Sequence, residues 1–467
     1  MTVLTRRSRS KGASLSAYSV TRRVIRVGAG VFAPGHLGKL TQHVPYEMVD
    51  AALAEAGPGK SRVREVPARV VVYLLLAGAL FADVGYRQVW DKLVAALEGV
   101  PVANPSSGVL AQARQRMGPA ALRALFDLVR GPGPAPRTRG RWWRGLLVCA
   151  IDGTSAAVAA SDANLAEYTP HRCNHGGSGY PKLRLLVLVC CETRTVIDAV
   201  FGPTTVGEVP YAKLLVAGLR PGMVVLLDRA FGAADLIAVI AQTGAYLVVR
   251  VKDNRKLPVI RRLPDGSYLS VIGQLRVRVV ECQIHVQTTG GRTTTMYRLV
   301  TTLAEHRQYP AFDLVRLYHE RWEVETAFLE LKSTILGGRV LRARTPAGVR
   351  QEIYALLITY QAIRLAMADA TDTRPDLDPD RACFTTALNA ARDLVVQAAN
   401  AIAGAVIDLV GAIGRRVLAN LMPNRRVRIA PRITKRAISK YNAKGPNIDR
   451  KTYQATIGID ILVTQSP

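Results

Sequence analysis

The sequence predicts a mixed α/β protein in which a helical region precedes an open sheet, and two observations carry this prediction. Residues 44–130 repeat their apolar positions at helical spacing. Residues 144–253 instead hold short apolar runs, bounded by Gly, Pro and acidic residues, that are typical of buried strands. The pattern changes at GPGPAPRTRGR, residues 131–141, which we interpret as a linker.

The composition describes a large folded protein with a polyanionic partner. Its 467 residues exceed the ~100–200 usual for one domain, so two to four structural units are expected. Lys and Arg number 63 against 35 Asp and Glu, which leaves a net charge of +28. We expect the partner to be nucleic acid, because a ribosomal or chromatin protein of equal charge seldom contains 49% hydrophobic residues.

The sequence indicates neither export nor a membrane anchor. The six cysteines show no paired spacing, and no apolar run follows the basic N-terminus. The most apolar stretch, residues 394–414, contains Gln397, Asn400 and Asp408 and keeps helical spacing, so a buried helix is expected there. We therefore expect a cytoplasmic protein that is associated with the nucleoid and has no contact with the membrane.

Helices and strands follow in a recognisable order. Helices are expected at 46–57, 68–83, 86–99 and 106–130, with Ser106 and Ser107 as candidate N-caps. One strand is expected at 144–154, two antiparallel strands at 183–202, a helix at 211–219, a strand at 221–228, a helix at 233–244 and a strand at 245–253. Three consecutive strands followed by alternating helix and strand is the order of a ribonuclease H-like α/β domain.

The rest of the chain supplies an insertion and a basic end. Short strands rich in Pro, Gly and Thr predict a β-rich insertion before helices return. The expected regions are a basic arm (1–43), a helical DNA-binding domain with its linker (44–140), the first part of the ribonuclease H-like domain (141–252), the insertion (253–305), the second part (306–372) and a helical C-terminal region with a basic tail (373–467).

One segment, AFDLVRLYHERWEVETAFLELKSTI at 311–335, carries two stripes at helical spacing. The apolar stripe, which predicts a face buried against the sheet, consists of Leu317, Val324, Phe328, Leu331 and Ile335. The second stripe places a phenol, a guanidinium, a carboxylate and an ammonium within an arc of roughly 60°. Its members are Tyr318, Arg321, Glu325 and Lys332. This combination is suited to gripping a phosphate backbone.

Three carboxylates are expected to meet at one edge of the sheet. Asp152 and Asp228 each end an apolar strand, and Glu325 lies on a helix that packs on the same sheet. Converged carboxylates repel one another unless cations lie between them, and hard cations such as Mg²⁺ take oxygen ligands. Two such ions would serve phosphoryl transfer on a nucleic-acid strand. An Asp at a strand end is by itself more often a surface turn, so the inference rests on the set of three.

The four residues of the second stripe spell Y-x2-R-x3-E-x6-K, the signature of DDE transposases of the insertion-sequence-four family, and the chain resembles that family. DGT around Asp152, LLDRAF around Asp228 and YLVVRVK at 246–252 extend the resemblance over most of residues 45–370. It implies cut-and-paste transposition, possible passage through a DNA hairpin, and a homodimer on the terminal inverted repeats and target DNA.

The resemblance also implies roles for individual residues. Asp152, Asp228 and Glu325 would bind Mg²⁺, with Mn²⁺ as a substitute, while Tyr318, Arg321 and Lys332 would hold phosphates. Trp322 either stacks on a flipped base or packs beneath the insertion. Three further basic residues either contact DNA or have structural roles, as a solvated strand end or as the partner of a carboxylate: Arg229, Arg250 and Lys252.

Two other functions account for parts of the sequence. A catalytically silent DNA-binding protein derived from a transposase would explain the charge, but it would not need three carboxylates and a complete signature. A ribonuclease H-like repair nuclease or resolvase would explain the carboxylates, but not the Tyr, Arg and Lys that share a stripe with Glu325. An active transposase accounts for all of these features.

Overall fold

The computed structural model describes most of the chain. The described residues are 24–26, 32–57, 66–97, 101–132, 142–170, 179–288, 291–374, 376–397, 411–423, 428–429, 433–434, 442–443 and 453–462. Residues 1–23 and 27–31 of the basic arm, the linker from 133 to 141 and residues 398–410 of the predicted buried helix lie outside them. The rest of the arm is described, and in it β1 (Val24–Arg26) pairs antiparallel with β2 (Phe32–Pro34). Among the described residues, no helix is both long and apolar enough to cross a membrane.

A helical region follows these two short strands, as predicted. It contains α1 (Tyr46–Glu55), α2 (Ala68–Leu80), α3 (Tyr86–Val94), α4 (Ser107–Met117) and α5 (Ala120–Val129), together with a short 3₁₀ turn, η3 (Leu40–Gln42). Ser106 is the N-cap of α4, because its hydroxyl accepts a hydrogen bond from the Val109 amide at 3.3 Å. Ser107, the second candidate cap, is instead the first residue of that helix.

Five strands form the centre of the large mixed sheet. They are β4 (Leu146–Ala157), β5 (Lys182–Cys190), β6 (Val196–Pro203), β7 (Met223–Leu227) and β8 (Tyr246–Arg250). Strands β4, β5 and β6 are antiparallel neighbours, whereas β7 and β8 run parallel to β4, so the spatial order is β6-β5-β4-β7-β8. The predicted sequence of elements is therefore found, with α7 (Glu208–Leu215), η4 (Val216–Gly218) and α8 (Ala234–Gln242) between the strands.

Strand β4 is longer than predicted, which corrects the position of the first carboxylate. The sequence suggested a strand that ends at Asp152, but β4 continues to Ala157, and Asp152 pairs with Val187 of β5 inside it. The polar run DGTS did not stop the strand because β5 continues beside it. Side chains alternate along a strand, so Asp152 and Thr154 point to the same face as Val148 and Ala150.

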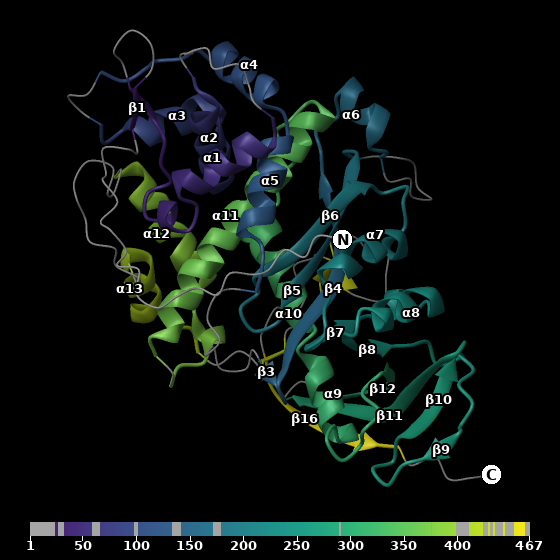
Figure 1. Ribbon diagram of the computed structural model, residues 1–467. Coiled ribbons are helices and arrows are strands. Elements are labelled where there is room, and N and C mark those ends of the chain that lie inside the picture. The colour runs from purple at the N-terminus through teal and green to yellow at the C-terminus, as the bar shows by residue number, and fades with distance from the viewer. Residues whose placement is uncertain are drawn as a thin grey trace, which may run out of the picture.

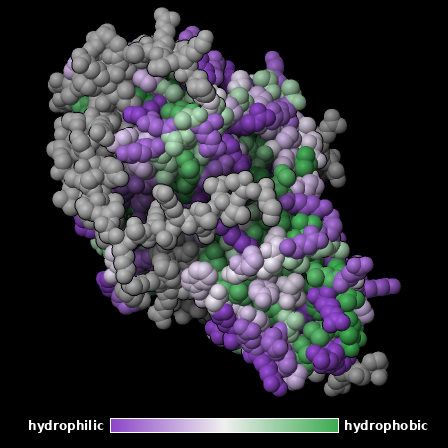
Figure 2. Space-filling view, viewed as in Figure 1, coloured by the Kyte–Doolittle hydropathy of each residue, from purple (hydrophilic) through white to green (hydrophobic). Residues whose placement is uncertain are grey.

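The predicted insertion is present, but it is continuous with the main sheet. It contains β9 (Arg261–Arg262), β10 (Tyr268–Ile272), β11 (Leu275–Thr288) and β12 (Gly291–Thr301). Strand β12 pairs with β8, which joins the insertion to the central strands in one 12-stranded sheet. Figure 2 shows mixed hydrophilic and hydrophobic side chains over this part of the surface, at the lower right. Its exposed side chains include Val259, Ile260, Arg261 and Arg262.

The C-terminal region contains helices, as predicted, but its basic tail includes a strand that was not predicted. After η7 (Pro379–Arg381), α12 (Phe384–Val396) and α13 (Gly411–Ala419), a nine-residue strand, β16 (Tyr453–Ile461), pairs antiparallel with β11 of the insertion. The short strands in this region are β13 (Arg428–Ile429), β14 (Ile433–Thr434) and β15 (Asn442–Ala443). The sequence YQATIGIDI alternates apolar and polar residues, which is typical of a strand. The prediction of a basic tail considered only the charge of this stretch.

Two hydrophobic cores lie on opposite faces of the sheet. On one face α7 and α8 cover alternate residues such as Cys149 and Ile151. On the other, Val148 and Ala150 pack in the core that includes the long helix α11 (Pro346–Asp372) and the segment after the insertion. Figure 1 shows α11 running between the helical region and the sheet. Asp152 therefore faces the side on which the signature segment packs.

Candidate active site

The signature segment lies on the sheet as three helical pieces rather than one. They are α9 (Ala311–His319), α10 (Trp322–Leu329) and a π-helical turn, η6 (Glu330–Ile335). Around the first break the hydrogen bonds tighten to i→i+3, as in Arg321 N to Tyr318 O, and at the end they widen to i→i+5, as in Leu336 N to Leu331 O. The apolar stripe is nonetheless buried as predicted, with Leu317, Val324, Phe328, Leu331 and Ile335 all at most 7% exposed.

Asp152 occupies a largely enclosed position. Its side chain is 21% exposed, and its Oδ1 accepts a hydrogen bond from the Gly153 amide at 2.8 Å. Burial raises the pKa of this carboxyl to about 6, and the negative charges of Glu325 and Asp228 add to the rise. The Gly153 amide and the Arg321 guanidinium act in the opposite direction. The charges of Glu325 and Asp228 thus both act on Asp152.

Asp228 and Glu325 approach from different elements. Asp228 directly follows β7, where its Oδ1 accepts the Arg229 amide at 2.6 Å and caps the short helix η5 (Arg229–Phe231). Glu325 lies in the first turn of α10 with a side chain that is 37% exposed. Asp228 therefore lies at the carboxyl end of its strand as predicted, whereas Asp152 lies within β4.

The guanidinium of Arg321 lies among these carboxylates. Its Nη2 donates to Glu325 Oε1 at 3.2 Å, and its Nη1 is 3.6 Å from Asp152 Oδ2. Burial acts to lower the pKa of Arg321, but the surrounding acidic groups, which include all three carboxylates, outweigh burial and raise it. Nε and Nη1 are buried and make no hydrogen bond within the described residues. Arg321 therefore neutralises the site but is only partly satisfied by it.

The donor set fits hard divalent cations in its chemistry. All three side chains are carboxylates. Burial, with a further contribution from the charges of Glu325 and Asp228, raises the pKa of Asp152, and a bound cation would act against both effects. In the part of the chain that the structure describes, no three acidic, His or Cys side chains lie close enough together to hold a metal ion. Arg321 provides the positive charge between them in this conformation.

The other signature residues have distinct environments. Tyr318 is only 5% exposed, and its hydroxyl donates to the Leu227 carbonyl at 3.2 Å, beside Asp228. Burial raises its pKa. Lys332, in the π-helical turn, donates to Thr154 Oγ1 at 3.0 Å. Tyr318, Arg321 and Lys332 thus lie around the carboxylate site, although the helix that carries them is interrupted between α9 and α10.

The remaining predicted contacts divide into exposed and packed residues. Trp322 is 45% exposed, with the Arg321 guanidinium carbon 5.1 Å from its ring centre. The side chains of Arg229 and Lys252 are exposed. Arg250 instead lies 4.0 Å over the ring of Tyr297 and donates to the Met296 carbonyl at 3.2 Å. Its surroundings are those of a packed strand end.

Two residues at the site were not identified from the sequence. Tyr297 of β12 makes an edge contact with Tyr318, their ring centres 6.1 Å apart, and thereby links the insertion to the signature segment. Thr154 accepts the Lys332 hydrogen bond. The alternation of β4 places Thr154 on the face of Asp152, so a longer predicted strand would have identified it.

The raised pKa of Asp152 has a consequence for stability without divalent cations. Because its pKa in the folded protein, about 6, lies above the ordinary 3.8, the folded state binds more protons between these values. The stabilising contribution of this group is full below the lower value and is lost as the pH rises through the higher one. The melting temperature of the wild type should therefore fall relative to that of Asp152→Asn between pH 4 and pH 7. If the melting temperatures of the two proteins instead change with pH in the same way, the pKa of this carboxyl is not raised in the folded protein.

Comparison with known proteins identifies the class. A family model described as "Transposase DDE domain" matches residues 143–362, which contain β4, β7, the insertion and α10. The chain is therefore a DDE-type polynucleotidyl transferase, a class that depends on divalent metal ions and whose domain implies a ribonuclease H-like fold. A second model, "Insertion element 4 transposase N-terminal", matches residues 34–127 of the helical region. The chain belongs to the insertion element 4 family of DDE transposases.

Individual relatives agree with this assignment. The chain is 24% identical over 424 residues to the transposase InsG for insertion sequence element IS4 of Escherichia coli strain K12. The aligned residues make up 87% of this chain and 93% of that relative. A cryo-EM structure of the piggyBac transposase synaptic complex with hairpin DNA matches at a TM-score of 0.39 and 13% identity, over 83% of this chain and 85% of that one. At this TM-score and identity, the match says nothing about the chemistry or the assembly of this chain.

Proposed function

We propose that this transposase cleaves the ends of its insertion sequence and joins the freed 3′-hydroxyl to target DNA at a site formed by Asp152, Asp228 and Glu325. The observation that carries the proposal is the convergence of these three carboxylates, from β4, the end of β7 and α10, around the single guanidinium of Arg321. The order β6-β5-β4-β7-β8 supports a ribonuclease H-like core, interrupted after β8 by the insertion.

Metal binding is assigned to the same carboxylates. Asp152, Asp228 and Glu325 would hold Mg²⁺, or Mn²⁺ in its place. A bound pair of such ions lowers the pKa of an attacking water or 3′-hydroxyl and stabilises the charge on the leaving oxygen. The chain's own contribution is to fix the ligands: Tyr318 holds the main chain beside Asp228, and β5 holds Asp152 within the sheet.

Phosphate binding is assigned to the basic groups around the carboxylates. Lys332 is half-buried beside Thr154, and two guanidinium nitrogens of Arg321 make no hydrogen bond to any described residue. Both side chains therefore have donors suited to a phosphodiester. Arg229 and Lys252 extend the positive surface, and the exposed ring of Trp322 is suited to stacking on an unpaired base. Tyr318 is too enclosed to reach a phosphate in this conformation, so its phosphate contact stays a prediction.

Assembly and location complete the proposal. The partners would be double-stranded terminal repeats and target DNA, bound by a homodimer in a synaptic complex. A hairpin intermediate is one of the routes of excision open to such an enzyme. The regions 1–43, 44–140, 141–252, 253–305, 306–372 and 373–467 remain our proposed division of the chain. A protein with this activity acts on chromosomal DNA in the cytoplasm.

A cleavage assay on DNA that carries the inverted repeats flanking the reading frame tests the function. In Mg²⁺ the wild type should cut at the repeat ends, and Asp228→Ala should bind the DNA without cutting it. Asp235→Ala on α8 is a matched control, because Asp235 is an exposed carboxylate paired with Lys213 away from the site. If Asp228→Ala still cleaves the DNA, the proposed mechanism is wrong. If the wild type binds the DNA but does not cleave it, the silent DNA-binding protein becomes the better explanation.

A further inference from the structure

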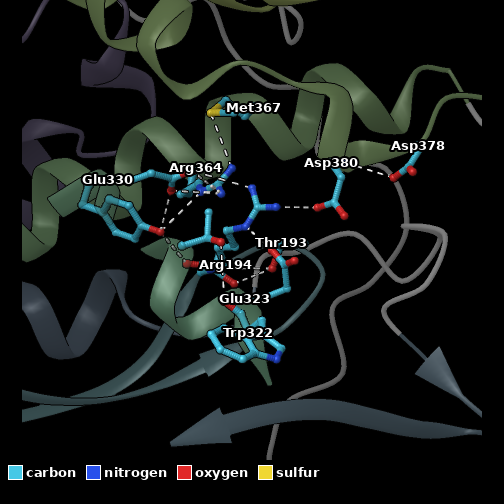
Figure 3. Close-up of polar contacts among 12 residues, drawn as sticks. Thr193, Arg194, Trp322, Glu323, Glu330, Arg364, Met367, Asp378 and Asp380 are labelled. Carbon is cyan, nitrogen blue, oxygen red and sulfur yellow. Dashed lines mark hydrogen bonds and ion pairs between the residues drawn. The ribbon is translucent and has the colours of Figure 1, made fainter. Parts of the chain in front are cut away.

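A buried cluster of charges lies immediately behind α10. At its centre is Arg194, in the turn between β5 and β6, whose side chain is 1% exposed. Its φ of 54° is in the left-handed region, which is uncommon for a residue with a Cβ and persists where the surroundings hold it. Figure 3 shows the guanidinium of Arg194 extending from this turn into the middle of the cluster.

Three carboxylates surround Arg194. Its Nε donates to Glu323 Oε2 and its Nη2 to Asp380 Oδ1 at 2.5 Å, while Nη1 is 3.7 Å from Glu330 Oε1. Glu330 is held from its other side by Arg364 Nη2 at 3.0 Å and by the Tyr360 hydroxyl at 3.1 Å, both on α11. The charges raise the pKa of Arg194 in spite of burial. One guanidinium thus ties α10, the π-helical turn and η7 to the β5–β6 turn.

The partners of Arg194 flank the residues assigned to chemistry. Glu323 precedes Glu325 by two positions in the first turn of α10, and Glu330 begins the π-helical turn that carries Lys332. A π-helical turn is rare and occurs mostly as a single turn within an α-helix, so an external contact at its first residue helps to fix where the wider winding starts. The rotation of α10 and the start of the turn are therefore both set from Arg194.

We propose that Arg194 is a positioning residue for DNA cleavage: by gripping Glu323 and Glu330 it fixes the orientation of the segment that presents Glu325 and Lys332. This inference rests on the proposed catalytic role of Glu325. Buried ion pairs contribute little net stability but set geometry strictly, because their charges must be met by partners at particular places. Arg194 touches neither Glu325 nor Lys332 and acts only through the helix.

Arg194→Lys is the primary test, because it keeps the charge but replaces the three-sided fork with a point charge. The variant should bind terminal-repeat DNA with the wild-type Kd but cleave about 100-fold more slowly at saturating DNA and Mg²⁺, as expected when ligands are misplaced by about 1 Å. Mn²⁺ binding to the DNA-free protein, measured by electron paramagnetic resonance, should weaken as well. A purely structural role would lower the melting temperature without changing Mn²⁺ affinity.

Arg278→Lys is the matched control. Arg278 is also fully buried and also held by a carboxylate, Asp265, but its contacts lie in the insertion and at the start of α9. It should lose comparable stability with at most a few-fold change in cleavage rate once both proteins are assayed well below their melting temperatures.

The outcomes separate this inference from the proposed function. The positioning role is overturned if folded Arg194→Lys cleaves DNA at the wild-type rate. It is also overturned if the cleavage rate of Arg194→Lys falls by no more than that of Arg278→Lys. If Arg194→Lys does not fold, Glu323→Gln serves in its place, since it removes one charge at a position that is 13% exposed, and normal cleavage by that variant is equally contradictory. If Glu325→Gln itself cleaves normally, the proposed function fails first.

Discussion

Glu325→Gln should give a folded protein that binds terminal-repeat DNA and does not cut it. A Gln can still accept the hydrogen bond that Arg321 donates at 3.2 Å, and the side chain is 37% exposed, so folding has little reason to change. It cannot carry the charge that a divalent cation requires. We expect cleavage to slow by about 10³-fold or more, roughly 4 kcal/mol in the barrier.

The comparison for this variant is Asp313→Asn. Asp313 is a carboxylate of the neighbouring helix α9 that pairs with Arg144 at 2.5 Å and is 32% exposed. Removing its charge should leave cleavage within a few-fold of the wild type. Time courses of strand cleavage under single-turnover conditions, with enzyme in excess over DNA, measure both rates. A Glu325→Gln protein that cuts at the wild-type rate would show that Glu325 is not part of the catalytic site.

Val324→Asp should prevent folding before any question of chemistry arises. Val324 is fully buried on the face of α10 that packs in the core of α11, next in sequence to Glu325. An unpaired carboxylate there has no partner to offset its lost hydration, which costs about 3–5 kcal/mol. That is a large share of the ~5–15 kcal/mol that holds a typical domain together.

Leu329→Asp provides the contrast within the same helix. Leu329 is 58% exposed, so an added charge should change the free energy of unfolding by less than about 0.5 kcal/mol. Urea unfolding followed by circular dichroism measures both variants. Equal stability of the two would mean that α10 does not pack on the sheet by the predicted face.

Several features of the fold followed directly from the sequence because they depend on local periodicity. The stripe from Leu317 to Ile335 predicted a buried face, and all five of its members are buried. The apolar runs predicted the central strands, and Asp228 lies immediately after β7 as expected. Such signals persist because side-chain direction repeats every two residues in a strand and every 3.6 in a helix.

Other features depend on contacts between distant segments and have no local signal. The sequence around Glu330 does not indicate a π-helical turn, and the ion pairs of Glu330 are with Arg364 and Arg194, which are distant in the sequence. The stripe pattern did not indicate that Arg321 also lies beside Asp152, because that contact depends on where the sheet and the helix meet. The pairing of β16 with β11 joins residues more than 160 positions apart, as in Ile284 with Ile459.

The central claim is that Asp152, Asp228 and Glu325 form one divalent-metal site, and metal-directed cleavage of the polypeptide tests it most directly. Fe²⁺ bound in place of Mg²⁺, with ascorbate and peroxide, generates hydroxyl radicals that cut the chain next to the metal. We expect cuts near residues 152, 228 and 325 together, suppressed by excess Mg²⁺ and absent from Asp228→Ala. Cuts at only one of these places, or cuts that Mg²⁺ does not suppress, would contradict a shared site.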